Sequence, residues 1–154
     1  MGDPPQQSLI RALVARVGMI GPVVVGLLLL VAGIMKASSP NEVTELLVSQ
    51  AIIPPLVVPA AVLLIITTEL FLGIGLVLVP RQRSVLSAIA IVFLCCVTSY
   101  LVWLVALRGF GAQCGCFAYV KSTAFSGVIR NFAIMAMLVP RALHPARVGS
   151  KGES

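Results

Sequence analysis

Four long apolar runs constrain this chain more than any other feature. The first three span about Val17 to Met35, Leu56 to Val79 and Val85 to Leu107. The fourth is uninterrupted only from Phe132 to Val139, so it must extend back through Arg130 to about Ser126 or Thr123 to cross a bilayer. A helix needs about 20 apolar residues to cross about 30 Å of hydrocarbon. In lipid the backbone must satisfy its own hydrogen bonds, which favours helices. We predict an all-α membrane protein, a four-transmembrane-helix bundle.

The composition supports one membrane domain. Of 154 residues, 59% are hydrophobic and 10% charged, whereas a soluble domain carries roughly 25% charged residues. We expect a cytoplasmic segment over 1–16, a membrane domain over 17–140 and a cytoplasmic basic tail over 141–154. A cleaved signal peptide is the alternative for the first run, since Ala37-Ser38-Ser39 resembles a cleavage site. The run is longer than the apolar core of a typical signal peptide.

Proline and polar residues mark the connections. Pro40 to Val48 is expected to form a short interfacial helix, with Leu46 and Leu47 facing the membrane. Pro54 suits the entry to the second span, because a proline at a helix start removes a donor that would be unpaired there. Pro140 is expected to end the fourth span.

The basic residues are distributed unequally between the two sides of the predicted bundle. One side carries Arg11, Arg16, Arg81, Arg83, Arg141, Arg147 and Lys151, and the other carries Lys36, Arg108 and Lys121. The positive-inside rule then predicts both termini in the cytoplasm (N-in, C-in) of an inner, or cell, membrane. The net charge of +6 is dispersed, which argues against a nucleic-acid partner.

The sharpest chemical feature is Cys114-Gly115-Cys116, which the predicted orientation places outside the cytoplasm, on the periplasmic or exterior side. Thiols two residues apart can reach disulfide geometry, and the small ring would be strained and readily reduced. This pattern favours a redox pair. A structural disulfide, two passive thiols, or a soft-metal site for an ion such as Cu(I) are the alternatives. The single histidine, His144, excludes a His-rich metal site.

Cys95 and Cys96 lie in the middle of the third span. Adjacent helical positions point about 100° apart, so the two thiols cannot face one partner. We expect both to act as small apolar side chains, with a relay thiol as the alternative.

Glu69, Arg130 and Lys36 are charged residues that fall within or at the ends of the predicted spans. Glu69 lies near the centre of the second span, where a charge needs a partner, a proton or a cavity. Arg130 and Lys36 could join Glu69 in a polar cluster under the loop from Arg108 to Thr123, which contains Cys114 and Cys116 and is called the Cys loop below. Alternatively, each could extend separately to the interface. We predict that Glu69 and Arg130 interact, directly or through a bound polar ligand.

Small residues recur on two spans. Gly26 and Gly33 share one face of the first, and Gly73 and Gly75 follow Glu69 on the second. Small residues let helices approach closely in lipid, so we expect packing roles for these glycines.

Together these residues resemble the methylamine-utilisation protein MauE family, within the broader DoxX-like group of redox-associated membrane proteins. The likeness covers about Val17 to Val139. It rests on Gly33, Lys36, Pro54, Glu69, Gly73, the run Cys114-Gly115-Cys116-Phe117, and the pair Arg130-Asn131. One departure is Ala118, where a glycine commonly follows the phenylalanine.

The resemblance implies a role in maturing extracytoplasmic proteins, in the type family the disulfide-rich small subunit of methylamine dehydrogenase. It also implies a thioredoxin-like partner. We therefore expect an integral membrane thiol–disulfide redox protein with catalytic Cys114 and Cys116. Lys36, Glu69, Arg130 and Asn131 are auxiliary, and a quinone is a possible electron carrier. The alternative is a non-catalytic assembly or transport factor whose Cys loop binds a client or a soft metal.

Overall fold

The computed structural model describes residues 5–51, 53–114 and 122–143. A pair of two-residue strands, β1 and β2, joins the last two long helices. In chain order the elements are α1 (Pro5–Ser38), α2 (Pro40–Gln50), α3 (Val58–Leu78), the 3-10 turn η1 (Pro80–Gln82), α4 (Arg83–Arg108), β1 (Gln113–Cys114), β2 (Ser122–Thr123) and α5 (Ala124–Leu143).

The predicted all-α bundle is confirmed in this part of the chain. Four stretches are long and apolar enough to cross a membrane: Gly18–Ser38, Val58–Leu78, Pro80–Arg108 and Ala124–Leu143. The fourth does extend back through Arg130, as the length of a bilayer requires. The uninterrupted apolar run from Phe132 to Val139 would have been too short to span the bilayer by itself.

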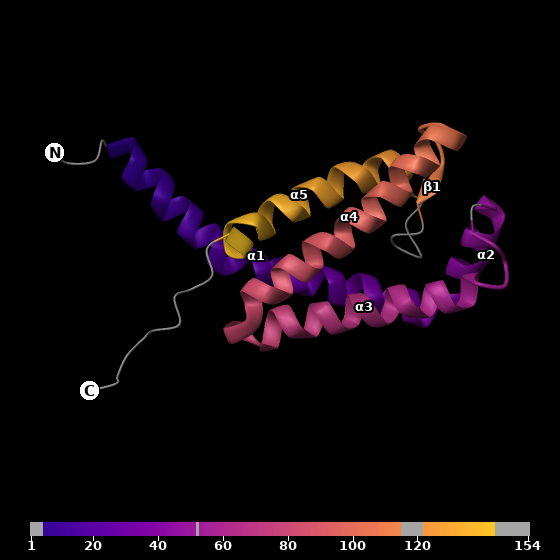
Figure 1. The fold of residues 1–154 in the computed structure, drawn as a ribbon, viewed down its shortest axis with the longest axis horizontal. Coiled ribbons are helices and arrows are strands. Elements are labelled where there is room, and N and C mark those ends of the chain that lie inside the picture. Colours follow the sequence, from indigo (N-terminus) through magenta and orange to yellow (C-terminus); the bar gives the residue numbers. More distant parts are fainter. Residues whose placement is uncertain (1–4, 52, 115–121, 144–154) are drawn as a thin grey trace.

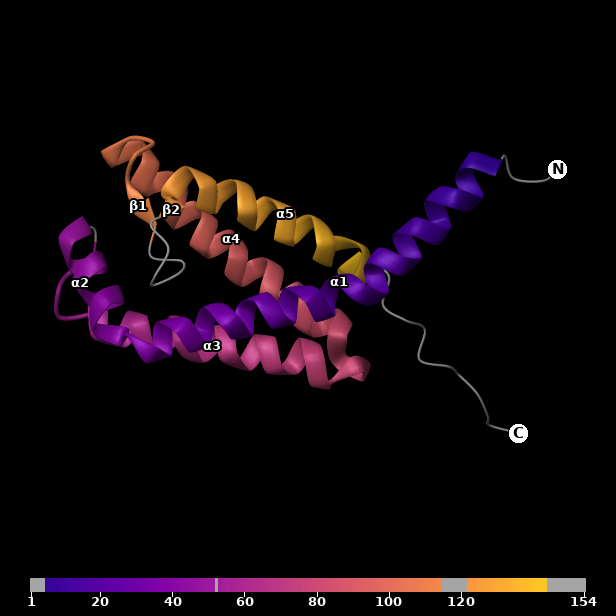
Figure 2. The same ribbon diagram turned by 180° about the vertical axis from the view of Figure 1, so that it is seen from behind.

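One predicted boundary was wrong, the one at the end of the fourth span. Helix α1 begins at Pro5, and its stretch that could cross a membrane begins at Gly18, so most of the predicted segment 1–16 is helical but precedes that stretch. That part of α1 extends beyond the bundle (Figures 1 and 2). Pro140 does not end α5, which continues to Leu143. A proline this near the carboxyl end of a helix disturbs only its last turn, and membrane helices tolerate such positions when neighbours pack against them.

The helices pack in the lateral order α3, α1, α5, α4. Helix α1 contacts both α3 and α5, and α4 packs on α5 along its length. Glycines permit the closest approaches. A Cβ at Gly73 would lie 2.7 Å from Leu30 Cγ and 2.9 Å from the Gly26 carbonyl oxygen, and one at Gly21 would lie 2.6 Å from the Met137 carbonyl oxygen. The expected packing role of glycine therefore holds for Gly26 and Gly73.

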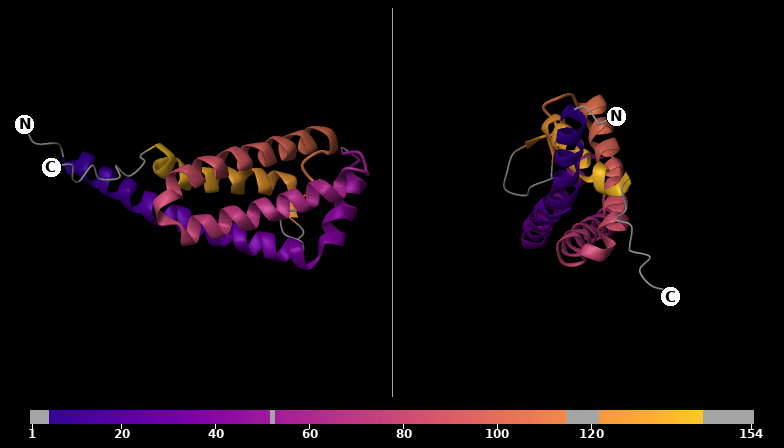
Figure 3. Two further views of the ribbon diagram at one scale, coloured as in Figure 1. Left: turned by 60° about the horizontal axis from the view of Figure 1, so that its bottom comes forward. Right: turned by 90° about the vertical axis from the view of Figure 1, so that its left-hand side faces the viewer.

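Helices α3 and α4 are joined tightly at one end and diverge toward the other (Figures 1 and 3). At the joined end, Arg83 donates hydrogen bonds to the carbonyl oxygens of Leu76 and Val77, at 3.0 and 3.1 Å. A cation there satisfies carbonyls that a helix end leaves unpaired.

Helix α2 lies in the mouth between the diverging helices, beside the end where β1 is found (Figures 1 and 2). Leu47 is buried in a cluster with Val58 and Val62 of α3. The expectation that Leu46 and Leu47 face the membrane was therefore wrong for Leu47. Leu46 is half-buried and lines a cavity inside this mouth. The predicted short helix exists, but its apolar face packs on protein.

Candidate functional site

A buried ion pair joins α1 to α3. Lys36 Nζ donates hydrogen bonds to Glu69 Oε1 at 2.5 Å and to Glu69 Oε2 at 2.7 Å. The two residues are only 5% and 7% exposed. Lys36 therefore does not extend separately to the interface, and the direct partner of Glu69 is Lys36 rather than Arg130. Desolvating two charges is costly, so a pair held this deep needs a close geometry or a functional reason.

Arg130 and Asn131 approach the same pair from α5. A small cavity of about 60 Å³ is lined by both residues together with Lys36 and Glu69. Arg130 lies close enough to Glu69 for a favourable electrostatic interaction. Glu69 and Arg130, which were predicted to interact, therefore line the same cavity.

Asn131 ties this cluster to α4. It is buried, and its Nδ2 donates a hydrogen bond of 3.1 Å to Thr98 Oγ1. Thr98 in turn donates to the Leu94 carbonyl oxygen at 2.7 Å. A buried amide needs such partners. The bond fixes α5 relative to α4 beside the ion pair.

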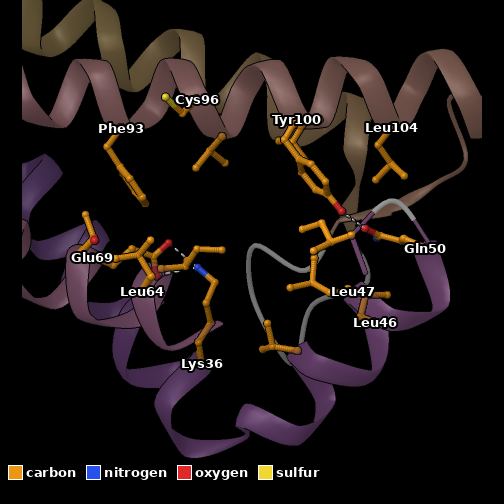
Figure 4. A pocket seen from close by; sticks show the side chains of 16 residues that line it. Lys36, Leu46, Leu47, Gln50, Leu64, Glu69, Phe93, Cys96, Tyr100 and Leu104 are labelled. Atoms are coloured by element: carbon orange, nitrogen blue, oxygen red, sulfur yellow. Dashed lines mark hydrogen bonds and ion pairs between the residues drawn. The ribbon is translucent and has the colours of Figure 1, made fainter. Parts of the chain in front are cut away.

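A larger cavity of about 390 Å³ lies between α2, α3 and α4, with the ion pair at one end (Figure 4). Phe93, Cys96, Tyr100 and Leu104 of α4 lie along one side, and Leu46, Leu47 and Leu64 lie across from them (Figure 4). Most of the lining is apolar carbon. A volume of this size is in the range of pockets that hold small organic ligands.

Polar contacts secure α2 over this cavity. Tyr100 donates its hydroxyl hydrogen to Gln50 Oε1, at the end of the cavity away from the ion pair (Figure 4). Arg108 Nη2 donates to the Gln50 carbonyl oxygen at 2.8 Å. Two residues of α4 therefore bind the last residue of α2.

The Cys loop leaves and re-enters the bundle next to this region. The backbone of Cys114 pairs with Ser122, and the Ala124 amide donates to the Ala112 carbonyl oxygen at 2.7 Å. Cys116 lies outside the described residues, as do Gly115, Phe117 and Ala118. The structure thus fixes the two ends of the loop at the end of the bundle that also carries α2 (Figures 1 and 2).

The two thiols of α4 point in different directions, as helix geometry predicts. Cys96 lines the large cavity, whereas Cys95 lines a separate depression between α4 and α5. Cys95 Sγ lies 3.5 Å from Met135 Sδ. Neither thiol is enclosed by protein. That Cys95 acts as a small apolar side chain remains a prediction. Cys96, by contrast, lines the large cavity, as do both residues of the ion pair.

Sequence reasoning did not identify Gln50, Phe93, Tyr100 and Arg108 as parts of a site. One signal was present, because positions 93, 96, 100 and 104 recur at helical spacing and so share one face of α4. The partner of Tyr100 is fifty residues away in sequence. No local pattern reveals such a contact.

Comparison with known proteins gives one match over most of the chain. The model of the family described as methylamine utilisation protein MauE matches residues 14–144. No curated protein and no solved structure matches. The matched range includes α2 to α5, α1 from residue 14 onward, and every candidate residue discussed above.

Proposed function

Because the chain belongs to the family of the methylamine utilisation protein MauE, we propose that it is a thiol–disulfide redox protein of the inner, or cell, membrane. Its clients are extracytoplasmic proteins with disulfide bonds. The observation that supports the proposal is that the strand containing Cys114 lies at the same end of the bundle as a cavity with a buried ion pair.

The chemistry is exchange between the Cys114–Cys116 pair and a client. In the oxidising direction, a client thiolate attacks the pair's disulfide and forms a mixed disulfide, and one cysteine of the pair leaves as a thiolate. The client's second thiolate then attacks the mixed disulfide, which gives an oxidised client and a reduced pair. The same steps run in reverse when the client is reduced.

Turnover requires a second redox partner. In the oxidising direction, a lipid-soluble carrier of the quinone class takes two electrons and two protons from the reduced pair, giving a disulfide and a hydroquinone. In the reducing direction, a hydroquinone or a thioredoxin-like protein restores the two thiols. The buried Lys36–Glu69 pair, with Arg130 and Asn131 beside it, supplies polar groups next to an apolar cavity that opens within the membrane part of the chain.

We place both termini in the cytoplasm and the Cys loop outside. The asymmetry of Lys and Arg supports this orientation. A membrane-impermeant maleimide, applied to intact cells after mild reduction, should label Cys114 or Cys116. Labelling only after the membrane is opened would reverse the orientation and remove access to extracytoplasmic clients.

Trapping a client tests the function directly. In the reducing direction, a Cys116→Ser variant retains Cys114 as the attacking thiol but lacks the second thiol that would resolve the mixed disulfide. It should therefore accumulate a complex with the client on a non-reducing gel, and dithiothreitol should dissociate that complex. The reciprocal Cys114→Ser variant reports whether Cys116 is the attacking thiol. Cys95→Ala is the matched control and should behave as the native protein. If neither single variant yields a complex with an extracytoplasmic protein, and the double variant supports client maturation normally, the proposal fails.

A further inference from the structure

The large cavity between α2, α3 and α4 has a composition that restricts its ligand. Its walls are formed mostly by leucine, isoleucine and valine, with the rings of Phe93 and Tyr100 on α4. Leu64, which lines it, is 67% exposed, so the cavity reaches the lipid-facing surface of the bundle. A molecule can therefore enter from the bilayer without crossing water.

The inner end of the cavity is lined by an ion pair that offers hydrogen bonds, with Arg130 in the adjoining small cavity. Lys36 and Glu69 neutralise each other, and both line the cavity. An ammonium group has three donors, and two of those on Lys36 are directed to the Glu69 carboxylate. The third can donate to a ligand carbonyl.

A second polar group lies at the opposite end. The Tyr100 hydroxyl and the Gln50 side chain meet there, beneath the end of α2 (Figure 4). Between the two ends the lining is apolar and includes Phe93. The arrangement suits a flat, apolar body that carries a hydrogen-bond acceptor toward the Lys36 end, and a quinone ring is such a body.

We propose that this cavity is the binding site for the quinone-class carrier, with one ring carbonyl accepting from Lys36 and the ring packed against Phe93 and Tyr100. The isoprenoid tail leaves past Leu64 into lipid. The proposal rests on the proposed function for its redox meaning, but the binding itself does not require Cys114 or Cys116. A phospholipid acyl chain is the competing occupant.

Cys96 provides a reporter inside the cavity, and its neighbour provides a control. The test uses full-length protein in detergent with Cys114→Ser and Cys116→Ser. One version carries Cys95→Ala and so retains only Cys96, and the other carries Cys96→Ala and retains only Cys95. The two thiols are adjacent on α4 but line different depressions. The rate of alkylation by an apolar maleimide is measured with and without decylubiquinone, whose fully substituted ring has no open position for thiol addition.

We expect decylubiquinone at about ten times its dissociation constant to slow alkylation of Cys96 about tenfold, since only unoccupied protein reacts. Alkylation of Cys95 should not change. Decanol, which matches the tail but lacks the ring, should leave both rates unchanged. Equal protection of Cys96 by decanol would identify an acyl-chain pocket, and equal protection of both thiols would identify non-specific partitioning. Either result, or no protection, overturns the proposal.

The polar end is tested by a charge-neutral pair of substitutions. Lys36→Met combined with Glu69→Gln removes the ammonium donor without leaving a buried charge unpaired. We expect about tenfold weaker binding of decylubiquinone, the factor typical of losing a hydrogen bond from a charged donor. Unchanged affinity in a variant that elutes as a single species would reject the role of Lys36.

The result separates this site from the thiol chemistry. Protection of Cys96, together with no trapped client and normal client maturation in the double cysteine variant, would retain the site and reject the proposed function. A trapped client without protection would do the opposite, and the carrier would have to bind elsewhere.

Discussion

Helix α3 forms two very different contacts one turn apart. We call the contact of α3 with α1 at Gly26 and Gly73 the closed seam. We call the region where α3 and α4 diverge around the large cavity the open seam. In the closed seam, backbone approaches so closely that no Cβ fits. Glu69 lies one turn away from Gly73 and lines the cavity of the open seam. The close approach at glycine brings the end of α1, and with it Lys36, to the edge of the cavity.

The difference shows how a membrane bundle can be rigid and still hold a ligand. Where α1 and α3 touch, small residues maximise backbone contact, which is the main source of helix association in lipid. Where α3 and α4 diverge, the large cavity is bounded by α2, by the contact of Tyr100 with Gln50 and by the Lys36–Glu69 ion pair. The closed seam therefore positions the charged group, and the open seam supplies the space for a ligand.

The ion pair gives the largest predicted effect on stability. Lys36→Met leaves the Glu69 carboxylate without its direct partner, and breaking a buried pair from one side typically costs about 3 to 5 kcal/mol. The unfolding free energy can be measured by denaturing-detergent titration. Lys36→Met combined with Glu69→Gln should recover most of the loss. If the double variant is as unstable as the sum of the two single variants, the two residues do not act as a pair.

Substitutions in the closed seam should have the next largest effect on stability. Gly73→Ala places a Cβ 2.7 Å from Leu30 Cγ and against the α1 backbone. We expect a loss of about 1 to 3 kcal/mol, as for other overpacked interiors. Gly111→Ala is the matched control, because a Cβ there meets nothing within 4 Å, and its effect should stay within about 0.5 kcal/mol. Equal effects of the two substitutions would mean that the closed seam is not tightly packed.

The hydrogen bond that secures α2 should contribute less. Tyr100→Phe removes the hydroxyl that donates to Gln50 and retains the ring. We expect a loss of about 1 kcal/mol, the typical value for one such bond. Alkylation of Cys96 should become faster, because α2 then closes the cavity less firmly, while Cys95 should not respond. A slower reaction of Cys96 would show that Tyr100 does not hold the cavity closed.

The coupling between Glu69 and Arg130 should be the smallest effect. The two residues interact electrostatically, but the direct partner of Glu69 is Lys36. A double-variant cycle with Glu69→Gln and Arg130→Gln should give a coupling of about 0.5 to 1 kcal/mol, the lower end of values for neighbouring residues. Strict additivity would assign Arg130 a role independent of Glu69. A coupling larger than the Lys36–Glu69 value would make Arg130 the main partner.

The sequence by itself determined the elements that lipid imposes. Apolar runs of sufficient length must become helices in a bilayer, so the four spans and the short helix after the first followed from composition and proline positions. The end of α5 at Leu143 did not follow, because the tolerance of a proline near a helix end depends on what packs nearby. Glu69 was marked as needing a partner by its depth alone.

The tertiary structure decided which partner Glu69 has and where the cavity lies. Lys36 and Arg130 were both plausible from sequence, and the choice depends on the rotation of α1 against α3 that the contact of Gly26 with Gly73 sets. The contacts of Gln50 with Tyr100 and Arg108 join positions fifty or more residues apart. Lipid imposes helices locally, but rotation, tilt and divergence of helices result from packing over their whole length.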